Sequence, residues 1–445
     1  MPVSLVAWAL VALLLAVVLT RPQWEPRLAA RGFPVRRWPW HWWLAGYPET
    51  VLRIWSTWRR LAHLNGLSVS TAPDRRVIGR DLVVQGQALR PRPPRLTWPV
   101  PTKNGLRLGV LLHPGQTPAP YFAAARAMEH AWRVHGVRVT STRRGQVVIH
   151  VTARDPLTGD VPSAGSPAPS LLSADVGRIE DGEPWVIDLR RVPHWLVTGA
   201  TQSGKSSLLA ALVLGLAPQP VGLVGIDCKG GMELGLFGGR LSALATDRTQ
   251  AVGLLSGLVD EIQARMRVCR EAGQRSIWTL PDHLRPVPLV VIVDELAELY
   301  LNDGSRVARD EAEQCGTLLL RVAQLGAALG VHLVIAGQRV GSDIGPRVTA
   351  LRAQLGGRIA HRAHDEASAE MTLGDINPDA VITAQNISED EQGVAVVATG
   401  GRWTRARSRL VTTADAAGIA RTDPPANPYL TQPDPVHFEK GDAAA

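Results

Sequence analysis

One eight-residue stretch limits the folds open to this chain more than any other feature. Residues 199–206 read Gly-Ala-Thr-Gln-Ser-Gly-Lys-Ser and fit the pattern G-x-x-x-x-G-K-[ST]. The apolar run His194–Thr198 before it predicts a short buried strand, and the good helix formers of Lys205–Leu214 predict a helix after it. A glycine-rich loop between a strand and a helix cradles phosphates, so the sequence predicts a nucleoside triphosphate site.

Each residue type in this loop has a physical task. Backbone N–H groups and the positive N-terminus of the helix hold the α- and β-phosphates, Lys205 reaches the β/γ oxygens, and the Ser206 hydroxyl ligates Mg²⁺. The residues expected to bind the nucleotide are Gly199, Ala200, Thr201, Gln202, Ser203, Gly204, Lys205, Ser206 and Ser207.

A second apolar run, Pro288–Val293, ends in Asp294 and Glu295. A carboxylate at the C-terminal end of a buried parallel strand can hold magnesium or its waters, and the next one can polarise the attacking water. We assign the first role to Asp294 and the second to Glu295. The alternative, an acidic pair that only begins a solvated helix, is disfavoured by the glycine-rich loop upstream.

A third apolar run, Val331–Gly337, carries Gln338 and Arg339 at its tip. An amide in this position can sense the γ-phosphate or orient water, although a simple polar end of a strand is the alternative. The order of the three runs predicts an α/β fold: a RecA-like P-loop ATPase core with a mostly parallel sheet, using ATP and Mg²⁺.

These blocks resemble the FtsK/SpoIIIE family of DNA translocases, in the HerA-FtsK branch of P-loop ATPases, over about residues 175–410. Ile226–Lys229 with Glu233 is similar to the family's I-D-P-K segment, with Cys228 in place of the proline. The blocks at 193–206, 293–297 and 331–339 are similar as well, although Val340 replaces a usual proline. The resemblance implies double-stranded DNA as the partner and self-assembly into a ring, expected to be a hexamer.

Gly357–Arg362 resembles the late R-I-A-F-R strand of the same family. The resemblance implies that Arg358 acts on the nucleotide of a neighbouring subunit, with Arg362 as the alternative. With Lys205, Glu295 and Gln338, Arg358 completes the expected catalytic set, and Ser206 and Asp294 are the expected metal ligands.

Lysine is rare in this chain, which makes each lysine informative. Among 48 basic residues the lysines are Lys103, Lys205, Lys229 and Lys440. Two of them lie in the ATPase blocks, where a compact ammonium suits a phosphate site better than a planar guanidinium. We expect Lys229 to contact a phosphate or a neighbouring subunit, or else to be an ordinary exposed cation. The three cysteines lack C-x-x-C spacing and indicate a reducing cytoplasm without a metal site.

The N-terminal end predicts a membrane anchor. Val3–Thr20 is an 18-residue run without charge, so residues 1–22 read as one transmembrane helix, with a cleaved signal peptide as the alternative. Arginines follow at once and place the C-terminal side in the cytoplasm. We therefore expect a single-pass protein of the cell membrane with a cytoplasmic motor.

Residues 23–65 are rich in tryptophan and arginine. Ile54, Trp55, Trp58 and Leu61 fall at helical spacing, so we expect an amphipathic helix in an interfacial segment on the lipid headgroups. The alternative is that these tryptophans pack the core of a small domain. Residues 1–150 carry 21 basic against 5 acidic side chains, which suits anionic lipid, DNA phosphates or both.

The remaining segments complete the expected domain organisation. Residues 66–153 read as a small α/β module with strands at Arg107–Leu112 and Gln146–Val151 and a helix over Pro120–Val134. Residues 154–174 read as a linker, 175–410 as the motor with a hairpin at Val176–Leu189, and 411–445 as a disordered, proline-rich tail.

A chain with one span and one motor most resembles the conjugative DNA-transfer proteins of actinobacterial plasmids and integrative elements, with other transfer proteins as further partners. Three alternatives stay open at this point: the ATPase of a protein secretion system, a chromosome-partitioning DNA translocase, and a scaffold that binds nucleotide without hydrolysing it. The intact Lys205, Asp294, Glu295 and Gln338 disfavour the scaffold.

Overall fold

The computed structural model describes residue 20 and residues 42–69, 92–158 and 170–422, apart from positions 103, 156, 302–303, 364, 375 and 377. The rest of the predicted membrane helix, residues 23–41 of the interfacial segment, most of the linker and residues 423–445 lie outside this description. No helix in the described part of the chain is long and apolar enough to cross a membrane. The chain divides into two compact units, residues 1–156 and 157–445.

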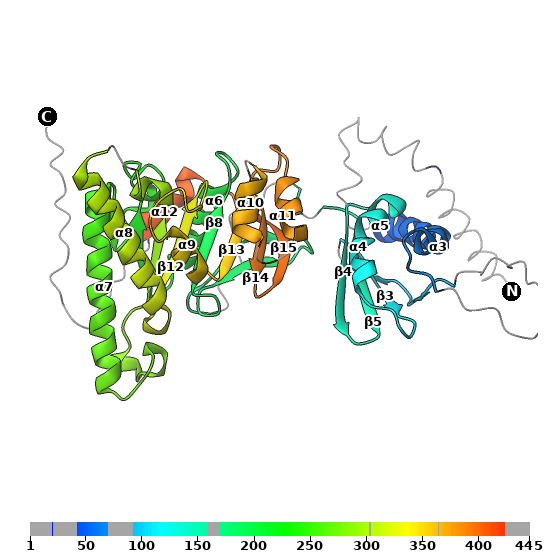
Figure 1. The fold of residues 1–445 in the computed structure, drawn as a ribbon, viewed down its shortest axis with the longest axis horizontal. Helices are drawn as coiled ribbons and strands as arrows, with labels where there is room; N and C mark the ends of the chain where they lie inside the picture. The colour runs from blue at the N-terminus through cyan, green and yellow to red at the C-terminus, as the bar shows by residue number, and fades with distance from the viewer. Residues whose placement is uncertain are drawn as a thin grey trace, which may run out of the picture. The chain divides into compact units, whose positions relative to one another are not determined.

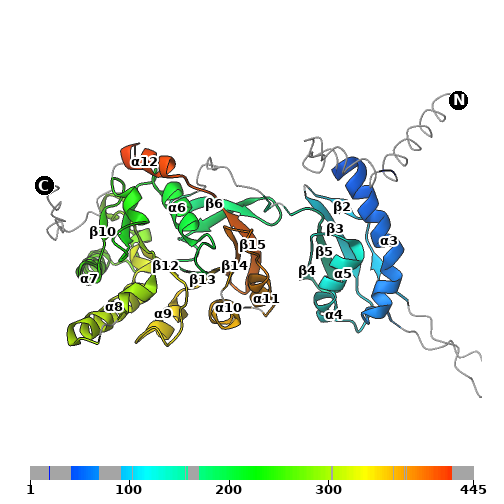
Figure 2. The ribbon, with the colours of Figure 1, turned by 90° about the horizontal axis from the view of Figure 1, so that it is seen from above.

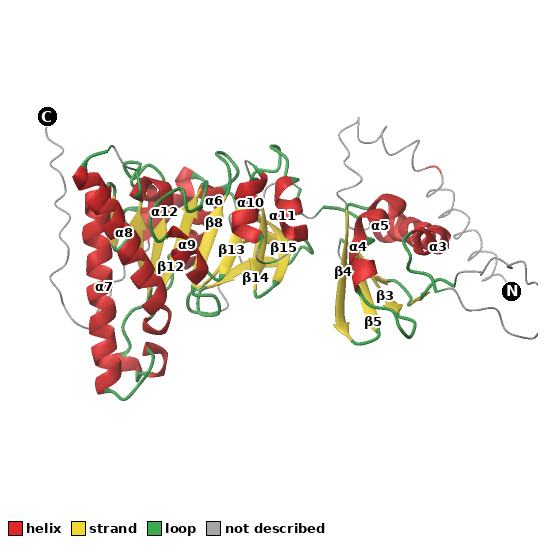
Figure 3. Ribbon diagram, in the orientation of Figure 1, coloured by secondary structure: helices red, strands yellow, loops and turns green. Residues whose placement is uncertain are grey.

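The first unit is an antiparallel sheet with helices on one face (Figure 1, Figure 3). Its strands follow the order β1-β3-β5-β4, and β2 pairs with β3. The strands are β1 (Arg95–Leu96), β2 (Val100–Pro101), β3 (Gly105–Leu111), β4 (Gly136–Arg143) and β5 (Gln146–Thr152), and the helices are α3 (Tyr47–Leu64), α4 (Ala119–Ala123) and α5 (Ala125–Trp132).

Alternation along β5 explains why one face of this sheet is covered. Val147, Ile149 and Val151 are buried, and the residues between them are half-buried. The buried set packs against Met128 and Trp132 of α5, so the sheet and the helices share one core. The expected helix at 120–134 is present as the two helices α4 and α5.

Helix α3 corrects the expectation for the tryptophan-rich segment. Ile54, Trp58 and Leu61 are buried in the core of the first unit, and the Trp58 ring lies 6.4 Å from that of Trp132. These residues therefore stabilise a domain core, which was the alternative in the sequence analysis, and they do not enter a lipid interface. The module begins before residue 66 because its sheet would otherwise expose apolar residues.

The second unit contains, within the described residues, a ten-stranded sheet of order β10-β9-β11-β12-β8-β13-β14-β15-β6-β7. The six strands from β10 to β13 are parallel, and the remaining four pair antiparallel. The parallel strands are β8 (His194–Thr198), β9 (Gly222–Ile226), β10 (Ala243–Ala245), β11 (Leu289–Val293), β12 (Val331–Gly337) and β13 (Gly357–His361). The antiparallel strands are β6 (Ser173–Ile179), β7 (Pro184–Asp188), β14 (Val394–Thr399) and β15 (Arg402–Ser408).

Helices cover both faces of this sheet (Figure 2). One face carries α6 (Lys205–Leu216) and α12 (Thr413–Thr422), and the other carries α7 (Arg248–Glu271), α8 (Arg306–Leu325), α9 (Val348–Gln354), α10 (Glu366–Leu373) and α11 (Pro378–Gln385). Burial from two sides explains the continuous apolar runs, because along β11 Val290 and Ile292 face one core while Val291 and Val293 face the other. The fold is thus α/β with a mixed, mostly parallel sheet.

Two boundaries differ from the sequence expectation. Helix α12 occupies residues assigned to the disordered tail, because Ala416 and Ile419 are one helical turn apart and are both buried. Leu157, assigned to the linker, is buried beside β14. Both segments belong to the second unit. The hairpin of β6 and β7 turns at Asp181 and Gly182, within the expected range.

Candidate functional site

The phosphate-cradling loop connects the C-terminal end of β8 to the N-terminus of α6. Gly204 has φ of +111°, a value that side chains rarely adopt, and a Cβ there would lie 2.5 Å from the backbone of Gly393. Glycine is required at this position both by the backbone conformation and by the close approach of a second chain segment. The loop is thereby shaped at the helix N-terminus, where anions bind.

Lys205 lies at the centre of the loop. Its Nζ donates a hydrogen bond to the carbonyl of Gly199 and another, of 3.4 Å, to that of Ala200. Burial lowers the pKa of Lys205, and the Glu295 carboxylate opposes that shift. The ammonium is therefore held within the site as a charge that can meet a phosphate.

The two carboxylates lie where β11 ends, at the same edge of the parallel sheet. Asp294 and Glu295 are both buried, and Glu295 accepts a hydrogen bond of 3.1 Å from the backbone N–H of Gln338. Burial, together with the charge of Asp227, raises the pKa of Asp294 to about 6. A carboxylate with that environment is a candidate ligand for a cation.

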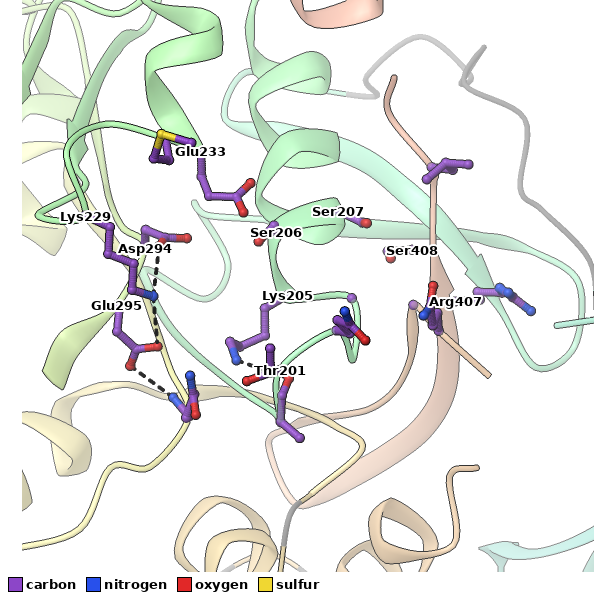
Figure 4. A pocket seen from close by; sticks show the side chains of 18 residues that line it. Thr201, Lys205, Ser206, Ser207, Lys229, Glu233, Asp294, Glu295, Arg407 and Ser408 are labelled. Atoms are coloured by element: carbon purple, nitrogen blue, oxygen red, sulfur yellow. Dashed lines mark hydrogen bonds and ion pairs between the residues drawn. The ribbon is translucent and has the colours of Figure 1, made fainter. Parts of the chain in front are cut away.

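Lys229 faces both carboxylates, which the sequence only partly anticipated. Its Nζ lies 3.7 Å from Asp294 Oδ2 and 3.6 Å from Glu295 Oε2 (Figure 4). The loop that presents it is fixed by buried Asp227, whose carboxylate accepts hydrogen bonds from the backbone N–H groups of Glu233 and Leu234 at 2.8 and 3.0 Å. Lys229 is therefore part of the site and not only a surface cation.

Lys205, Lys229, Asp294 and Glu295 line one cavity of about 710 Å³. Among the expected residues, it is lined by Ala200, Thr201, Gln202, Gly204, Lys205, Ser206, Ser207, Asp294, Glu295 and Gln338. The Ser206 hydroxyl and the Asp294 carboxylate face this shared cavity, and both are oxygen donors of the kind that Mg²⁺ prefers. They would hold the metal, which neutralises phosphate charge when bound.

The two arginines lie away from this cavity. Arg358, in β13, is half-buried and donates a hydrogen bond of 2.7 Å to the carbonyl of Arg352. Arg362 pairs with Glu389 at 3.2 Å. Neither residue lines the cavity of its own chain. Gly199 and Ser203 also lie outside the lining. Each accepts a hydrogen bond at its backbone carbonyl, Gly199 from Lys205 Nζ and Ser203 from the N–H of Gly393.

One wall of the cavity was not predicted from the sequence. It comes from the segment before β14, from the end of β15 and from the residues just after β15, and it is formed by Gln392, Gly393, Arg407, Ser408 and Leu410. These residues match no motif. Their position follows from long-range pairing, because β15 pairs with both β14 and β6.

The fold and the site define a P-loop ATPase with a mixed, mostly parallel sheet. Comparison with family models matches residues 166–283 and 278–342 to the FtsK/SpoIIIE family and residues 32–153 to the actinomycete conjugal transfer protein N-terminal domain. The chain belongs to the FtsK/SpoIIIE family and, within it, is an ATPase of the conjugal transfer type. The family resemblance noted in the sequence is confirmed.

Individual relatives agree with this family assignment. The chain is 43% identical to the transfer protein TraSA of Streptomyces ambofaciens over 343 residues, which is 74% of this chain and 81% of the relative. It is 44% identical over 249 residues to a sporulation regulatory protein of Streptomyces azureus, covering 56% of this chain and 80% of that protein. It is 30% identical to the DNA translocase FtsK of Pasteurella multocida over 269 residues, but that match covers only 27% of the translocase.

Among solved structures, the pCW3 conjugation coupling protein TcpA, in a monomer form with ATPγS, has the same fold. The TM-score is 0.54 at 20% identity, covering 82% of this chain and 98% of that one. At this identity the likeness concerns the fold alone.

Proposed function

We propose that this protein is an ATP-driven translocase of double-stranded DNA that serves conjugal transfer. The observation that carries the proposal is the single cavity that unites Lys205, Asp294 and Glu295 in a chain of the conjugal transfer type. The relatives' names refer to DNA translocation and to transfer, and they support DNA as the polymer moved. A protein secretion ATPase or a chromosome-partitioning translocase is less favoured, since the N-terminal match is to conjugal transfer proteins.

The residues of the cavity have separate roles in ATP hydrolysis. The loop N–H groups and Lys205 hold the phosphates, and Glu295 polarises the attacking water. The backbone N–H of Gln338 and the ammonium of Lys229 fix the Glu295 carboxylate. The Gln338 side chain lines the cavity, which supports a role for it in sensing the γ-phosphate.

We extend the proposal to the assembled protein. Arg358 lies outside the cavity of its own chain, as a residue that serves a neighbouring subunit must, and we propose a ring, a hexamer, in which it does so. The apolar run Val3–Thr20 anchors the ring in the cell membrane with the motor in the cytoplasm. Other transfer proteins are further partners of this assembly.

Hydrolysis of ATP by the full-length protein, measured with and without long duplex DNA, tests the proposal. We expect duplex DNA to raise the rate. Lys205→Ala should abolish nucleotide binding or turnover, and Glu295→Gln should bind ATP but hydrolyse it at least about 100-fold more slowly. A rate that does not respond to DNA, in protein whose Glu295→Gln variant is inactive, would leave an ATPase without a DNA-pumping role.

A further inference from the structure

The sheet of the first unit has one face that no helix of the described residues covers. Helices α3, α4 and α5 all lie on its other face (Figure 1, Figure 3). The five strands of this sheet contain no aspartate or glutamate, but they contain four arginines, Arg95, Arg107, Arg138 and Arg143. Strands of this composition give the sheet a positive charge that no acidic side chain of the same strands offsets.

The strand register places all four arginines on the uncovered face. Residues opposite each other on antiparallel strands share a face, and half-buried His150 alternates along β5 with the buried residues that face the helices. His150 is opposite Arg107 on one side and Arg138 on the other, so these three side chains form one row. A second row on the same face consists of Arg95, Leu111, Gln146 and Arg143. We call the surface that these two rows define the arginine face.

The middle of the arginine face carries small side chains. Gly109, Val148 and Thr140 are opposite one another between the two rows, and none of them is long or charged. A glycine inside a strand often marks a place where another molecule comes close. The two rows are four residues apart along β5, which is about 13 Å, and duplex DNA carries one phosphate per about 1.7 Å of its axis. One duplex can therefore meet both rows.

The charge of the two parts of the chain favours phosphate binding by the first unit. Residues 151–445 carry 27 basic and 35 acidic side chains, whereas residues 1–150 carry 21 basic and 5 acidic ones. A protein that moves DNA contacts mainly its phosphates, and arginine and lysine supply the affinity for them. The acidic motor half offers little positive charge for this purpose, and the first unit offers an excess of it.

We infer that the arginine face binds the phosphate backbone of double-stranded DNA and gives the protein a contact with DNA outside the motor. The inference deepens the proposed function and rests on it. Arg95, Arg107 and Arg143 are exposed, so their guanidinium groups can pair with phosphates directly, and half-buried Arg138 adds its charge to the same face. Phosphates carry no sequence information, so this contact is independent of sequence.

Anionic lipid headgroups are the other polyanion that arginines bind. A surface that rests on lipid presents tryptophan and long apolar side chains to the headgroup region. In this unit the exposed Trp55 and Trp98 lie against each other with ring centres 6.2 Å apart, and Trp55 belongs to α3, on the opposite face of the sheet. Strands β3, β4 and β5 contain no Phe, Tyr or Trp. These observations favour DNA as the occupant of the arginine face.

Binding of a random duplex to the full-length protein without nucleotide, measured over a range of salt concentrations, tests the inference. The logarithm of the association constant falls with the logarithm of the salt concentration, with a slope of about −0.9 per neutralised phosphate. The triple variant Arg95→Gln, Arg107→Gln, Arg143→Gln should therefore make this slope less steep by about 2 to 3. It should also weaken binding at low salt about tenfold or more.

A matched control removes the same charge from exposed positions of α3 and α5, with the substitutions Arg59→Gln, Arg60→Gln and Arg126→Gln. It should change the slope by less than about 1. Both triple variants should keep the rate of ATP hydrolysis without DNA, which shows that they fold. Equal losses of DNA affinity in the two variants would mean that net charge decides and not the arginine face, and an unchanged slope in the first variant would place the DNA elsewhere. Either result overturns the inference.

Modification of arginines by phenylglyoxal, read by mass spectrometry, gives a second measurement that needs no variant. In full-length protein held in phosphatidylcholine nanodiscs, duplex DNA should protect Arg107 and leave Arg126 reactive. Protection of Arg107 by phosphatidylserine in the nanodiscs, with none by DNA, would overturn the inference in favour of lipid.

Failure of this inference and failure of the DNA-pump proposal give different results. Hydrolysis of ATP that DNA stimulates while Arg107 stays reactive would remove the arginine face as a DNA contact and leave the pump. Protection of Arg107 by DNA that does not stimulate hydrolysis would support the arginine face and contradict the pump.

Discussion

Lys229 is the residue whose role the structure sharpens most. It is a positive charge 3.6–3.7 Å from both carboxylates, while Lys205 is held by the carbonyls of its own loop. Removing Lys229 leaves Asp294 and Glu295 close together without this cation, and it removes a contact that orients Glu295. The orientation of Glu295, which acts on the attacking water, affects the chemical step more than it affects the binding of the nucleotide.

We therefore predict that Lys229→Ala lowers kcat for ATP hydrolysis by about 10- to 100-fold while KM changes much less. Lys229→Arg keeps the charge and should restore part of the rate, although a guanidinium does not reproduce a compact ammonium. Steady-state kinetics of the two variants beside the wild type make the comparison. A rise in KM with kcat intact would show that Lys229 only helps to bind ATP, and unchanged kinetics would make it a surface cation.

For single residues of the site, the sequence predicts those that belong to a local motif. It does not predict those whose position depends on pairing between strands that are distant in the sequence. Asp294, Glu295 and Gln338 come at the ends of apolar strands, and Lys205 and Ser206 follow one through the glycine-rich loop. Parallel strands bring their carboxyl ends to one edge of the sheet. The unpredicted wall depends on which strands pair. Arg407 is opposite Val394 on one side and Arg178 on the other, a register that no local pattern encodes.

Among the elements, α3 shows how a helical pattern can predict a helix and still mislead about its surroundings. Its apolar face was expected at a lipid interface, but Ile54, Trp58 and Leu61 bury against the antiparallel sheet. The spacing of apolar residues predicts that one face of the helix is apolar, but it does not predict which element covers that face. Trp55, on another face of α3, is 50% exposed, so the interfacial role stays a prediction for such residues.

Packing of α5 against α3 gives a prediction for the first unit. Trp132 is fully buried and lies against Trp58, so Trp132→Ala should destabilise this unit by about 3–5 kcal/mol. Trp98 is 73% exposed, and Trp98→Ala should change stability by no more than about 0.5 kcal/mol.

Hydrogen exchange of the full-length protein resolves where the effect falls. Amides of β3 and β5 should lose protection in Trp132→Ala but not in Trp98→Ala, while those of β11 and β12 in the second unit stay protected in both. Equal effects of the two substitutions would show that the core around Trp132 contributes little to the stability of the first unit.

Parallel strands such as β11 and β12 were predicted from the sequence because burial from both faces leaves a continuous apolar run.

Antiparallel β15 was harder to foresee for the opposite reason. Arg402–Ser408 carries three arginines, and two of them bond to groups outside the strand: Arg405 to the Glu391 carboxylate at 2.8 Å, and Arg407 to the carbonyl of Leu157 at 2.8 Å. A strand of this composition reads as a loop until its neighbours are known.

For the whole molecule, the ring proposal depends on a residue acting between subunits. Protein mixed from Arg358→Ala and Lys205→Ala chains should recover part of the ATPase activity that each variant lacks, because some interfaces then pair an intact loop with an intact arginine. Mixed assemblies need to be confirmed by differential tagging. Absence of recovery in confirmed mixtures would assign Arg358 a structural role, consistent with its hydrogen bond to the Arg352 carbonyl.

Movement along DNA is the central claim, and displacement of a triplex-forming strand from duplex DNA by the full-length protein measures it most directly. We predict ATP-dependent displacement that is delayed in proportion to the length of duplex before the triplex, and that is absent in Glu295→Gln. Because a translocating motor contacts mainly phosphates, the rate should be nearly independent of sequence and should fall steeply as salt rises. A wild-type protein that hydrolyses ATP in the presence of duplex DNA, yet displaces no triplex at any length, would contradict the account.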